Sequence, residues 1–303
     1  MKGSVVTIGT FDGVHRGHRE ILRACAAHAR RLELPSVAVT FQIPPRLFFI
    51  PTAAPSLLTG VEEKRELILD CGIDRVCVLH FGRGLARLSA GEFFERVLVK
   101  RFRARRIVVG YNFGFGRNRE GDVRFLEAAG RRRGVGVTVI GPLCAGRVPV
   151  SSGRIRDCLR SGGLEEANRL LGRPYSITGR VVRGSGLGRR LGFPTANLSV
   201  PAERILVPGV FAVRAAVGTG AKRGLPGVCN VGWQPTVPGR DRDRPPRAEV
   251  HLLGFRGGLY GRTLRVDFIR KLRDEKTFAD MDSLKEQMAR DAKRARLYIR
   301  SKN

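Results

Sequence analysis

The sequence predicts an α/β domain followed by a compact all-β domain that ends in a helix. Between residues 4 and 173, five short runs rich in β-branched residues alternate with longer stretches whose apolar residues recur every three or four positions. From Tyr175 onward, strands follow one another with Gly and Pro turns between them, and only the last segment returns to a helical period. With 303 residues the chain is long enough for two domains. We therefore predict domains at 1–173 and 174–303.

The first half has the pattern of a parallel sheet with helices on both faces. Its expected strands are 4–9, 36–41, 75–81, 106–110 and 135–141, and its expected helices include 18–32, 62–72 and 89–102. Alternation of strand and helix is typical of a doubly wound sheet, whose ligands bind at the carboxyl ends of the strands. A pair of helices is expected within 148–172.

The second half has the pattern of an antiparallel barrel or sandwich. Regularly spaced strands with turn signals between them are typical of both folds. The expected strands are 175–184, 209–218, 224–232, 247–255 and 262–269. A final helix is expected over 281–299, with Asp282 or Ser283 available as its cap. The Pro- and Arg-rich stretch 238–247 reads as an exposed loop.

The chain is strongly basic, with 56 Lys and Arg against 27 Asp and Glu and a net charge of +29. Such a field attracts nucleic acid, an anionic membrane surface or phosphorylated small molecules, and does not choose between them. The basic residues are spread along the chain, and only 7% of the residues are aromatic, which disfavours a stacking platform for single strands. We expect small-molecule substrates and no nucleic acid partner, and the sequence leaves the oligomeric state open.

The six cysteines indicate a reducing compartment. They form no C-x-x-C pair and have no metal-ligand spacing. The apolar run at the N-terminus is interrupted by Gly9 and Asp12, which makes it too short for a signal sequence. No stretch approaches the roughly 18 apolar residues that a membrane helix needs. We expect a cytoplasmic protein without a membrane partner.

The most informative stretch is GTFDGVHRGH, residues 9–18, where a strand ends and a helix begins. Unpaired backbone N–H groups and the positive end of the helix dipole favour an anion there. His15 and His18 share a face of the first turn and can donate to the same phosphate, while the glycines admit a ligand close to the backbone. The simpler interpretation is that the histidines cap the helix or bind a metal.

This stretch resembles the HxGH signature of nucleotidyltransferases, and its longer form resembles the bacterial FAD synthetase branch of that superfamily. Further similarities follow in order: residues 108–123 resemble the flavin-side loop, SSGRIR at 151–156 resembles a phosphate-binding motif, and PTAN at 194–197 resembles that of riboflavin kinase. NVGWQPT, AEVHLLGF, LYG and LRDEKTF complete the kinase pattern. The chain thus resembles the bifunctional riboflavin kinase/FMN adenylyltransferase family, which implies a Rossmann-like nucleotidyltransferase domain and an antiparallel β-barrel kinase domain.

In the first half, the resemblance implies adenylylation of FMN to FAD by ATP with release of pyrophosphate. It makes His15, His18 and Arg156 catalytic, because they would contact the ATP phosphates, and a forked guanidinium suits the leaving phosphates. It implies contacts to flavin by Asn112 and Phe113. The further residues that it assigns to ATP or phosphate are Gly9, Phe11, Asp12, Gly13, Gly17, Ser151 and Ser152.

In the second half, the resemblance implies transfer of the ATP γ-phosphoryl group to riboflavin, which gives FMN. Glu249 would be the base, although a glutamate on such a strand can also be a rim residue paired with an arginine. Thr195 and Asn197 would bind Mg²⁺ through hard oxygen atoms. The remaining assignments are Gly184, Gly188, Pro194 and Thr195 to ATP, and Arg273 and Glu275 to flavin.

Three positions depart from the family pattern in the first half. Phe41 is followed by Gln42-Ile43-Pro44-Pro45, which lacks an acid and a histidine, while Gly153 stands for a threonine and Gly114 for a frequent arginine. One lost contact of about 1.4 kcal/mol slows a reaction tenfold. The alternatives are therefore a riboflavin kinase with a weakened or inactive first domain, a nucleotidyltransferase for another acceptor, and a basic nucleic-acid-binding protein on this scaffold.

Overall fold

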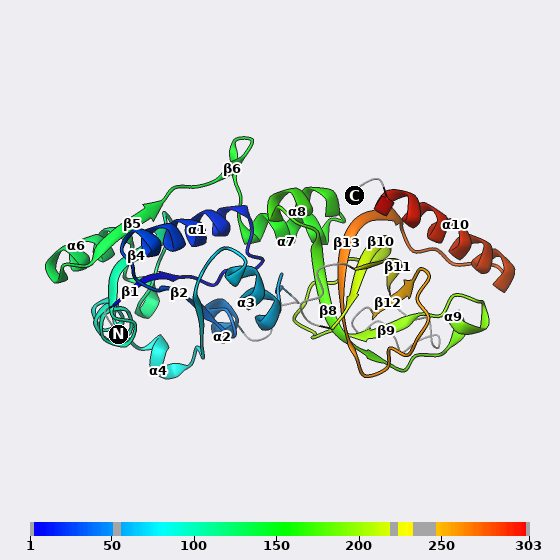
Figure 1. Cartoon of the computed structure of the whole chain (residues 1–303), viewed down its shortest axis with the longest axis horizontal. Coiled ribbons are helices and arrows are strands. Elements are labelled where there is room, and N and C mark those ends of the chain that lie inside the picture. Colours follow the sequence, from blue (N-terminus) through cyan, green and yellow to red (C-terminus); the bar gives the residue numbers. More distant parts are fainter. Residues whose placement is uncertain (1–2, 51–55, 219–223, 233–246, 301–303) are drawn as a thin grey trace. The chain divides into compact units, whose positions relative to one another are not determined.

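The computed structural model describes residues 3–50, 56–218, 224–232 and 247–300, and its ribbon is shown in Figure 1. The chain divides into two compact units. The first comprises residues 1–54 and 61–152, and the second comprises 55–60 and 153–303.

The first unit contains the predicted parallel sheet. Its strands are β1 (Ser4–Ile8), β2 (Ser36–Phe41), β3 (Arg75–Leu79), β4 (Ala104–Gly110) and β5 (Gly136–Ile140). All neighbours pair in parallel, in the order β3-β2-β1-β4-β5. The direction of strand progression reverses between β1 and β4, and at such a switch point the loops leave a crevice beyond the carboxyl ends of the strands.

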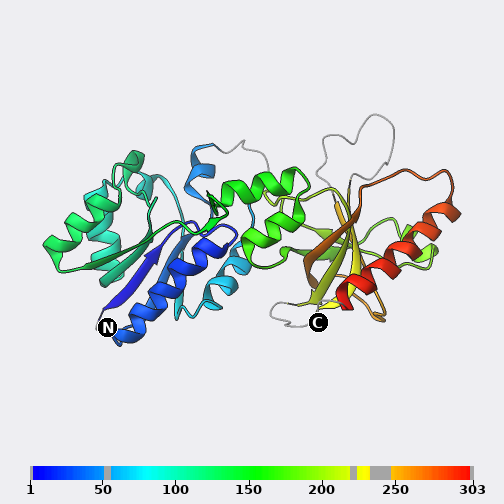
Figure 2. The same ribbon diagram turned by 90° about the horizontal axis from the view of Figure 1, so that it is seen from above.

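Helices cover both faces of this sheet, as the alternating pattern predicts. On one face α1 (Arg16–Arg31) and α3 (Val61–Leu69) pack on Val5, Ala38 and Val108, and Figure 2 shows α1 running along β1. On the other face lie the π-helical segment η1 (Phe93–Arg101) and α6 (Val123–Arg133). The shorter elements are α2 (Pro45–Phe49), α4 (Arg83–Ala86), α5 (Ala90–Glu92), η2 (Arg117–Arg119), β6 (Cys144–Ala145) and β7 (Val148–Pro149).

The second unit is a closed barrel with helices around it, so that of the two predicted β folds the barrel is the one present. Its strands are β8 (Tyr175–Val182), β9 (Ala196–Ser199), β10 (Gly209–Val217), β11 (Leu225–Gly232), β12 (Arg247–Leu252) and β13 (Thr263–Arg273). They pair antiparallel in the order β10-β11-β12-β9-β8-β13. The sequence patterns predicted five of these strands and missed β9. Helix α9 (Leu187–Arg190) precedes β9.

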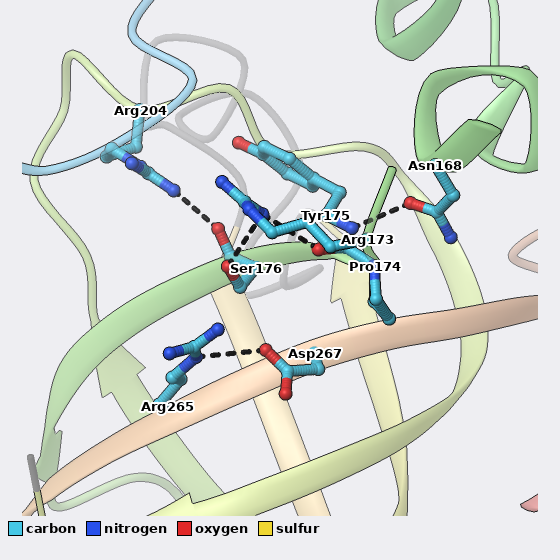
Figure 3. Close-up of polar contacts among 8 residues, drawn as sticks. All are labelled: Asn168, Arg173, Pro174, Tyr175, Ser176, Arg204, Arg265 and Asp267. Atoms are coloured by element: carbon cyan, nitrogen blue, oxygen red, sulfur yellow. Dashed lines mark hydrogen bonds and ion pairs between the residues drawn. The ribbon is translucent and has the colours of Figure 1, made fainter. Parts of the chain in front are cut away.

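The predicted helical pair is α7 (Ser152–Arg160) and α8 (Leu164–Leu171), and α8 is fastened to the barrel through one amide. The Asn168 side chain accepts from the backbone N–H of Tyr175 at 2.6 Å (Figure 3). It also donates to the carbonyl of Phe268 at 2.9 Å. The Tyr175 ring lies under the buried guanidinium of Arg204, which donates to the carbonyl of Ser176. These contacts hold the beginning of β8 in place.

Residues 56–60, which we call the strap, come from the first half of the sequence but belong to the second unit. The backbone N–H groups of Ser56 and Leu57 both donate to the carbonyl of Glu203 at 2.8 Å, and Leu57 forms a parallel bridge with Arg204. Leu58 is 1% exposed. The strap therefore adds buried apolar surface to a unit whose other residues come a hundred positions later.

The terminal helix α10 (Met281–Arg300) packs on β10 and β13 through Ala292, Ala295 and Ile299. The predicted cap is wrong: Asp280 accepts from the backbone N–H of Ser283 at 2.7 Å, so Asp282 and Ser283 lie within the first turn. An N-cap side chain usually accepts from the backbone N–H two or three residues later, as the Asp280 carboxylate does. The predicted loop at 238–247 lies, except for Arg247, outside the described residues. No helix among the described residues has the length and apolarity to cross a membrane.

Candidate active sites

The two predicted histidines lie together at the switch point of the parallel sheet. His15 is the N-cap of α1, and its Nδ1 accepts from the backbone N–H of His18 at 3.3 Å. The two rings are stacked with their centroids 3.6 Å apart and 19° between their planes, and the edge of Phe11 meets His18. The cap interpretation thus holds for His15, and the same contact orients both imidazoles. No cluster of three His, Cys, Asp or Glu suited to a metal occurs among the described residues.

Glycines shape the turn that carries the histidines. Gly13 has φ +86°, a region that side chains rarely adopt. A Cβ on Gly17 would lie 3.3 Å from Cε1 of His15, so the ring packs against bare backbone. The first turn of α1 carries no acidic residue that would oppose an anion. The turn is therefore suited to a phosphate group, as the sequence predicts.

A second segment of the first unit reaches this turn. The Ser152 hydroxyl donates to the carbonyl of Asp12 at 2.8 Å, which brings the Ser151–Ser152 pair beside the histidine loop. The structure thus gathers the first-unit residues predicted for phosphate: Gly9, Phe11, Asp12, Gly13, His15, Gly17, His18, Ser151 and Ser152. Arg156 lies in the second unit, where its Nε donates to the carbonyl of Ser56 at 2.6 Å, and its role at the phosphates stays a prediction.

The predicted flavin-side loop follows β4 at the same edge of the sheet. Phe113 stacks on Phe115 with centroids 5.2 Å apart, and Asn112 is exposed. The guanidinium of Arg119 packs over Gly114, since a Cβ there would lie 2.8 Å from Nη2. Nη2 also donates to the carbonyl of Asn112 at 3.5 Å. A guanidinium therefore stands beside position 114, although this position itself carries no side chain.

Sequence reasoning missed one buried cation at this edge, Lys64. Its side chain is 4% exposed, and its amine donates to the carbonyls of Thr10 and Phe41. The sequence pattern could have predicted this burial, because Lys64 shares a face of the expected helix with Leu67 and Ile68 at spacings of three and four. A charged residue on an apolar face requires a partner.

In the barrel, Glu249 lies in register between two asparagines. It is directly opposite Asn197 on β9 and Asn230 on β11. Opposite residues of an antiparallel pair have Cβ atoms about 4.5 to 5.5 Å apart, so the three side chains share one face. Val250 is buried on the other side, as the predicted alternation requires, and Glu249 is half-buried. Burial and, to a smaller extent, the charge of Glu249 raise the pKa of the neighbouring Cys229 thiol.

The predicted nucleotide loop folds over Asn197 and Thr195. A Cβ on Gly184 would lie 2.1 Å from Nδ2 of Asn197, and one on Gly188 would lie 3.0 Å from Oγ1 of Thr195. His251, two residues after Glu249, contacts the carbonyl of Pro194 through Nδ1 at 2.9 Å. His251 therefore links the strand of the carboxylate to the segment that carries Thr195, a contact that sequence reasoning did not predict.

The oxygen atoms of this site fit a magnesium ion. Asn197 is 8% exposed, and its Oδ1 has no hydrogen-bond partner among the described residues. A buried carbonyl oxygen without a partner is costly, and a bound cation would satisfy it. The Thr195 hydroxyl adds an oxygen donor of the kind that Mg²⁺ prefers.

The residues predicted to bind flavin in this unit have different environments. Arg273 forms an ion pair with Asp291 of α10 at 2.9 Å, and Asp291 is 1% exposed. This pair ties α10 to β13 and fixes the guanidinium. Glu275 is exposed and its carboxylate lies against the backbone of Gly232, where a Cβ would be 1.6 Å from Oε1. The flavin roles of both residues stay predictions.

Comparison with known proteins covers both units. Residues 1–154 match the FAD synthetase family and residues 171–299 match the riboflavin kinase family. A bifunctional riboflavin kinase/FMN adenylyltransferase of Escherichia coli (strain K12) is 42% identical over 98% of this chain and 93% of the relative. Proteins of the same name from Pseudomonas fluorescens (97% of this chain, 93% of the relative) and Haemophilus influenzae (99% and 96%) are 41% and 36% identical.

A solved structure described as a macrolide-efflux protein from Streptococcus pneumoniae has a TM-score of 0.84 and 28% identity, and the match covers 98% of this chain and 95% of that one. We take from this likeness the fold alone. The two family matches lie in order along the chain, and the named relatives align with it over nearly their whole length. The chain therefore belongs to the bifunctional riboflavin kinase/FMN adenylyltransferase family.

Proposed function

We propose that the chain phosphorylates riboflavin to FMN in the barrel and adenylylates FMN to FAD at the edge of the parallel sheet. One observation supports this proposal: the first unit has stacked imidazoles at a helix N-terminus, and the second has a carboxylate in register with an asparagine. ATP is a substrate of both reactions. We assign adenylyl transfer to residues 1–173 and phosphoryl transfer to residues 174–303.

In adenylyl transfer, an oxygen of the FMN phosphate attacks the α-phosphorus of ATP and pyrophosphate leaves. His15 and His18 would donate to phosphate oxygens on which negative charge develops, and the N-terminus of α1 would add its dipole. Ser152 holds the turn through the carbonyl of Asp12. Asn112 and Phe113 would contact the flavin, and Arg119 supplies a positive charge beside them for the phosphate of FMN.

In phosphoryl transfer, Glu249 accepts the proton of the ribityl 5′-hydroxyl, the oxygen of this hydroxyl attacks the γ-phosphorus of ATP, and ADP leaves. The strand pairing places this carboxylate opposite Asn197, which with Thr195 would hold Mg²⁺. The ion, when bound, neutralises charge on the transferred phosphate. Gly184 and Gly188 bring the nucleotide loop close to these two side chains. Arg273 and Glu275 would orient the flavin.

The test is a time course with purified protein, riboflavin, ATP and Mg²⁺, with FMN and FAD resolved separately. We expect FMN to appear first and FAD to follow with release of pyrophosphate. FMN without FAD would leave only the kinase, the outcome that Gln42–Pro45 and Gly153 suggest as the alternative. Neither product, with polynucleotide binding that persists at physiological salt, would support the nucleic-acid alternative.

Gly184→Ala is expected to impair the kinase by displacing Asn197. The added Cβ would stand 2.1 Å from Nδ2, so the amide must turn away from the site. Loss of one charge-assisted contact of about 1.5 to 3 kcal/mol corresponds to roughly a 10- to 100-fold fall in kcat/KM. Riboflavin kinase assays over a range of Mg²⁺ concentrations measure this, and Gly258→Ala, where a Cβ meets nothing within 4 Å, is the matched control. Equal activity of the two variants would contradict the assignment of Asn197.

Gly232→Ala is expected to raise the KM for riboflavin about tenfold, which is the effect of losing a hydrogen bond of about 1 to 1.5 kcal/mol. The new methyl group would occupy the place of the Glu275 carboxylate, which lies at the end of a flexible side chain and can move without unfolding the barrel. Steady-state kinetics with Gly258→Ala alongside provide the measurement. An unchanged KM would remove Glu275 from the flavin site.

The remaining sequence predictions concern the surroundings of the enzyme. We retain small molecules as its partners and the cytoplasm as its compartment. No nucleic acid partner is proposed, because phosphorylated substrates account for the chemistry that a net charge of +29 favours.

A further inference from the structure

Lys64 is a buried cation that the chemistry described above does not use. It projects from α3 on the face that carries Leu67 and Ile68, and 4% of it is exposed. An ammonium group is expensive to remove from water unless hydrogen bonds and a counter-charge compensate for the loss of hydration. Its position is therefore maintained by specific partners, and these partners indicate what it does.

The partners of Lys64 are the chain segments that leave β1 and β2. Its Nζ donates to the carbonyl of Phe41, the last residue of β2, at 2.7 Å and to the carbonyl of Thr10, just beyond β1, at 3.2 Å. The Thr10 carbonyl also accepts from the Thr40 hydroxyl at 3.0 Å. Two donors from different elements thus fix the peptide that begins the histidine turn.

That turn needs to be fixed, because its backbone is strained. Phe11 has φ +46° and Val14 has φ +39°, both in the left-handed region, and Val14 is β-branched. Such conformations cost about 1 to 3 kcal/mol each and persist only where the surroundings hold them. His15 follows directly and caps α1. Only the strained residues 11–14 separate Thr10 from His15. A displacement of the Thr10 peptide would therefore also displace both imidazoles.

Charge compensation for Lys64 also comes from this turn. Asp12 is 3% exposed, and its negative charge opposes the effect of burial on the amine. Burial is the larger influence and lowers the pKa of Lys64 to about 8. The backbone carbonyl of Asp12 in turn accepts a hydrogen bond from the Ser152 hydroxyl. The amine is thus connected to both segments of the phosphate site while remaining hidden from any ligand.

We propose that Lys64 is a positioning residue for adenylyl transfer, which ties the carboxyl ends of β1 and β2 together and thereby holds the strained turn that aims His15 and His18. This inference rests on the proposed adenylyltransferase function. Because Lys64 is 4% exposed and its amine donates to main-chain carbonyls, we expect its loss to act on the geometry of the imidazoles and not on the affinity of the site for ATP.

The experiment replaces Lys64 by Met, which fills similar space without donors, in the full-length protein. We expect kcat for conversion of FMN to FAD to fall at least about tenfold, because small misplacements of catalytic groups are costly, with KM for ATP changing less than kcat. Riboflavin kinase activity of the same sample should be unchanged. Arg65→Met is the matched control, since Arg65 is the exposed neighbour on α3 and loses the same charge. We expect wild-type rates for this control in both reactions.

A spectroscopic readout separates positioning from general destabilisation. The chain has five histidines, so NMR of the imidazole rings is tractable. In Lys64→Met the signals of His15 and His18 should shift, while those of His28 and His80, in the same unit, should stay. If this variant fails to fold, Thr40→Val removes the second donor to Thr10 with little change of shape, and it should show the same signature with a smaller loss of kcat.

Two results would overturn the role of Lys64. One is a Lys64→Met protein that keeps wild-type kcat and unchanged His15 and His18 signals, and the other is an equal loss in Arg65→Met. If Lys64→Met does not fold, a Thr40→Val protein with wild-type kcat and signals overturns it. A wild-type protein that makes no FAD from FMN would instead overturn the proposed function itself.

Discussion

Replacement of Glu249 by Gln is expected to lower the rate of FMN formation by about 10²- to 10⁴-fold, the usual contribution of a positioned general base. The amide keeps the shape of the side chain opposite Asn197 and Asn230 and loses the ability to accept the hydroxyl proton. The measurement is the single-turnover rate of riboflavin phosphorylation at saturating ATP and Mg²⁺.

The same protein contains its own control for this variant. Conversion of added FMN to FAD takes place in the other unit in our proposal, so it should proceed at the wild-type rate in Glu249→Gln. If FMN formation stays within a factor of a few of wild type, Glu249 is the rim residue paired with an arginine that the sequence alone also allowed. Parallel loss of both reactions would indicate a folding defect.

Replacement of His15 by Asn is expected to lower FAD formation from FMN by about 10²- to 10³-fold, which is typical for removal of one donor to a developing charge. Asparagine is a favourable N-cap, so α1 should still begin at Arg16, where the His15 side chain now accepts from the backbone of His18. The substitution thus separates the cap from the imidazole. Initial rates of pyrophosphate release from ATP and FMN provide the measurement.

Kinase activity is the internal reference for His15→Asn and should not change. A circular dichroism spectrum like that of wild type would confirm that α1 is intact. Should FAD formation persist at near wild-type rates in this folded variant, His15 would be a helix cap alone. The stacked ring of His18, 3.6 Å from that of His15, would then need to act without its neighbour.

Local pattern predicted most of the architecture. The five strands of the parallel sheet are rich in Val, Ile and Thr and are separated by amphipathic stretches, so periodicity identifies them directly. Strand β9 was missed because its four residues, Ala196–Ser199, carry too little pattern of their own. Its strand character depends on pairing with β8 and β12, which are distant in sequence. The Asp280 cap was missed because three polar residues compete for one position.

The candidate sites were predicted unevenly, for a related reason. Residues inside short motifs, such as His15, His18, Thr195 and Asn197, were assigned roles from spacing and resemblance, and these roles stay predictions. Residues whose importance depends on tertiary contacts were not found in this way, because a sequence does not show which carbonyl a lysine will reach. Lys64 is the main case.

The strap also affects how the protein reaches its native state. On a ribosome, residues 56–60 emerge long before Glu203 and Arg204, the residues with which they pair. The apolar side chain of Leu58 must wait for its partners while the last three strands of the parallel sheet are synthesised, and closing so long a loop is slow. Completion of the second unit is thus a late event in biogenesis, and a fragment that starts at residue 174 would lack the strap that pairs with Glu203 and Arg204.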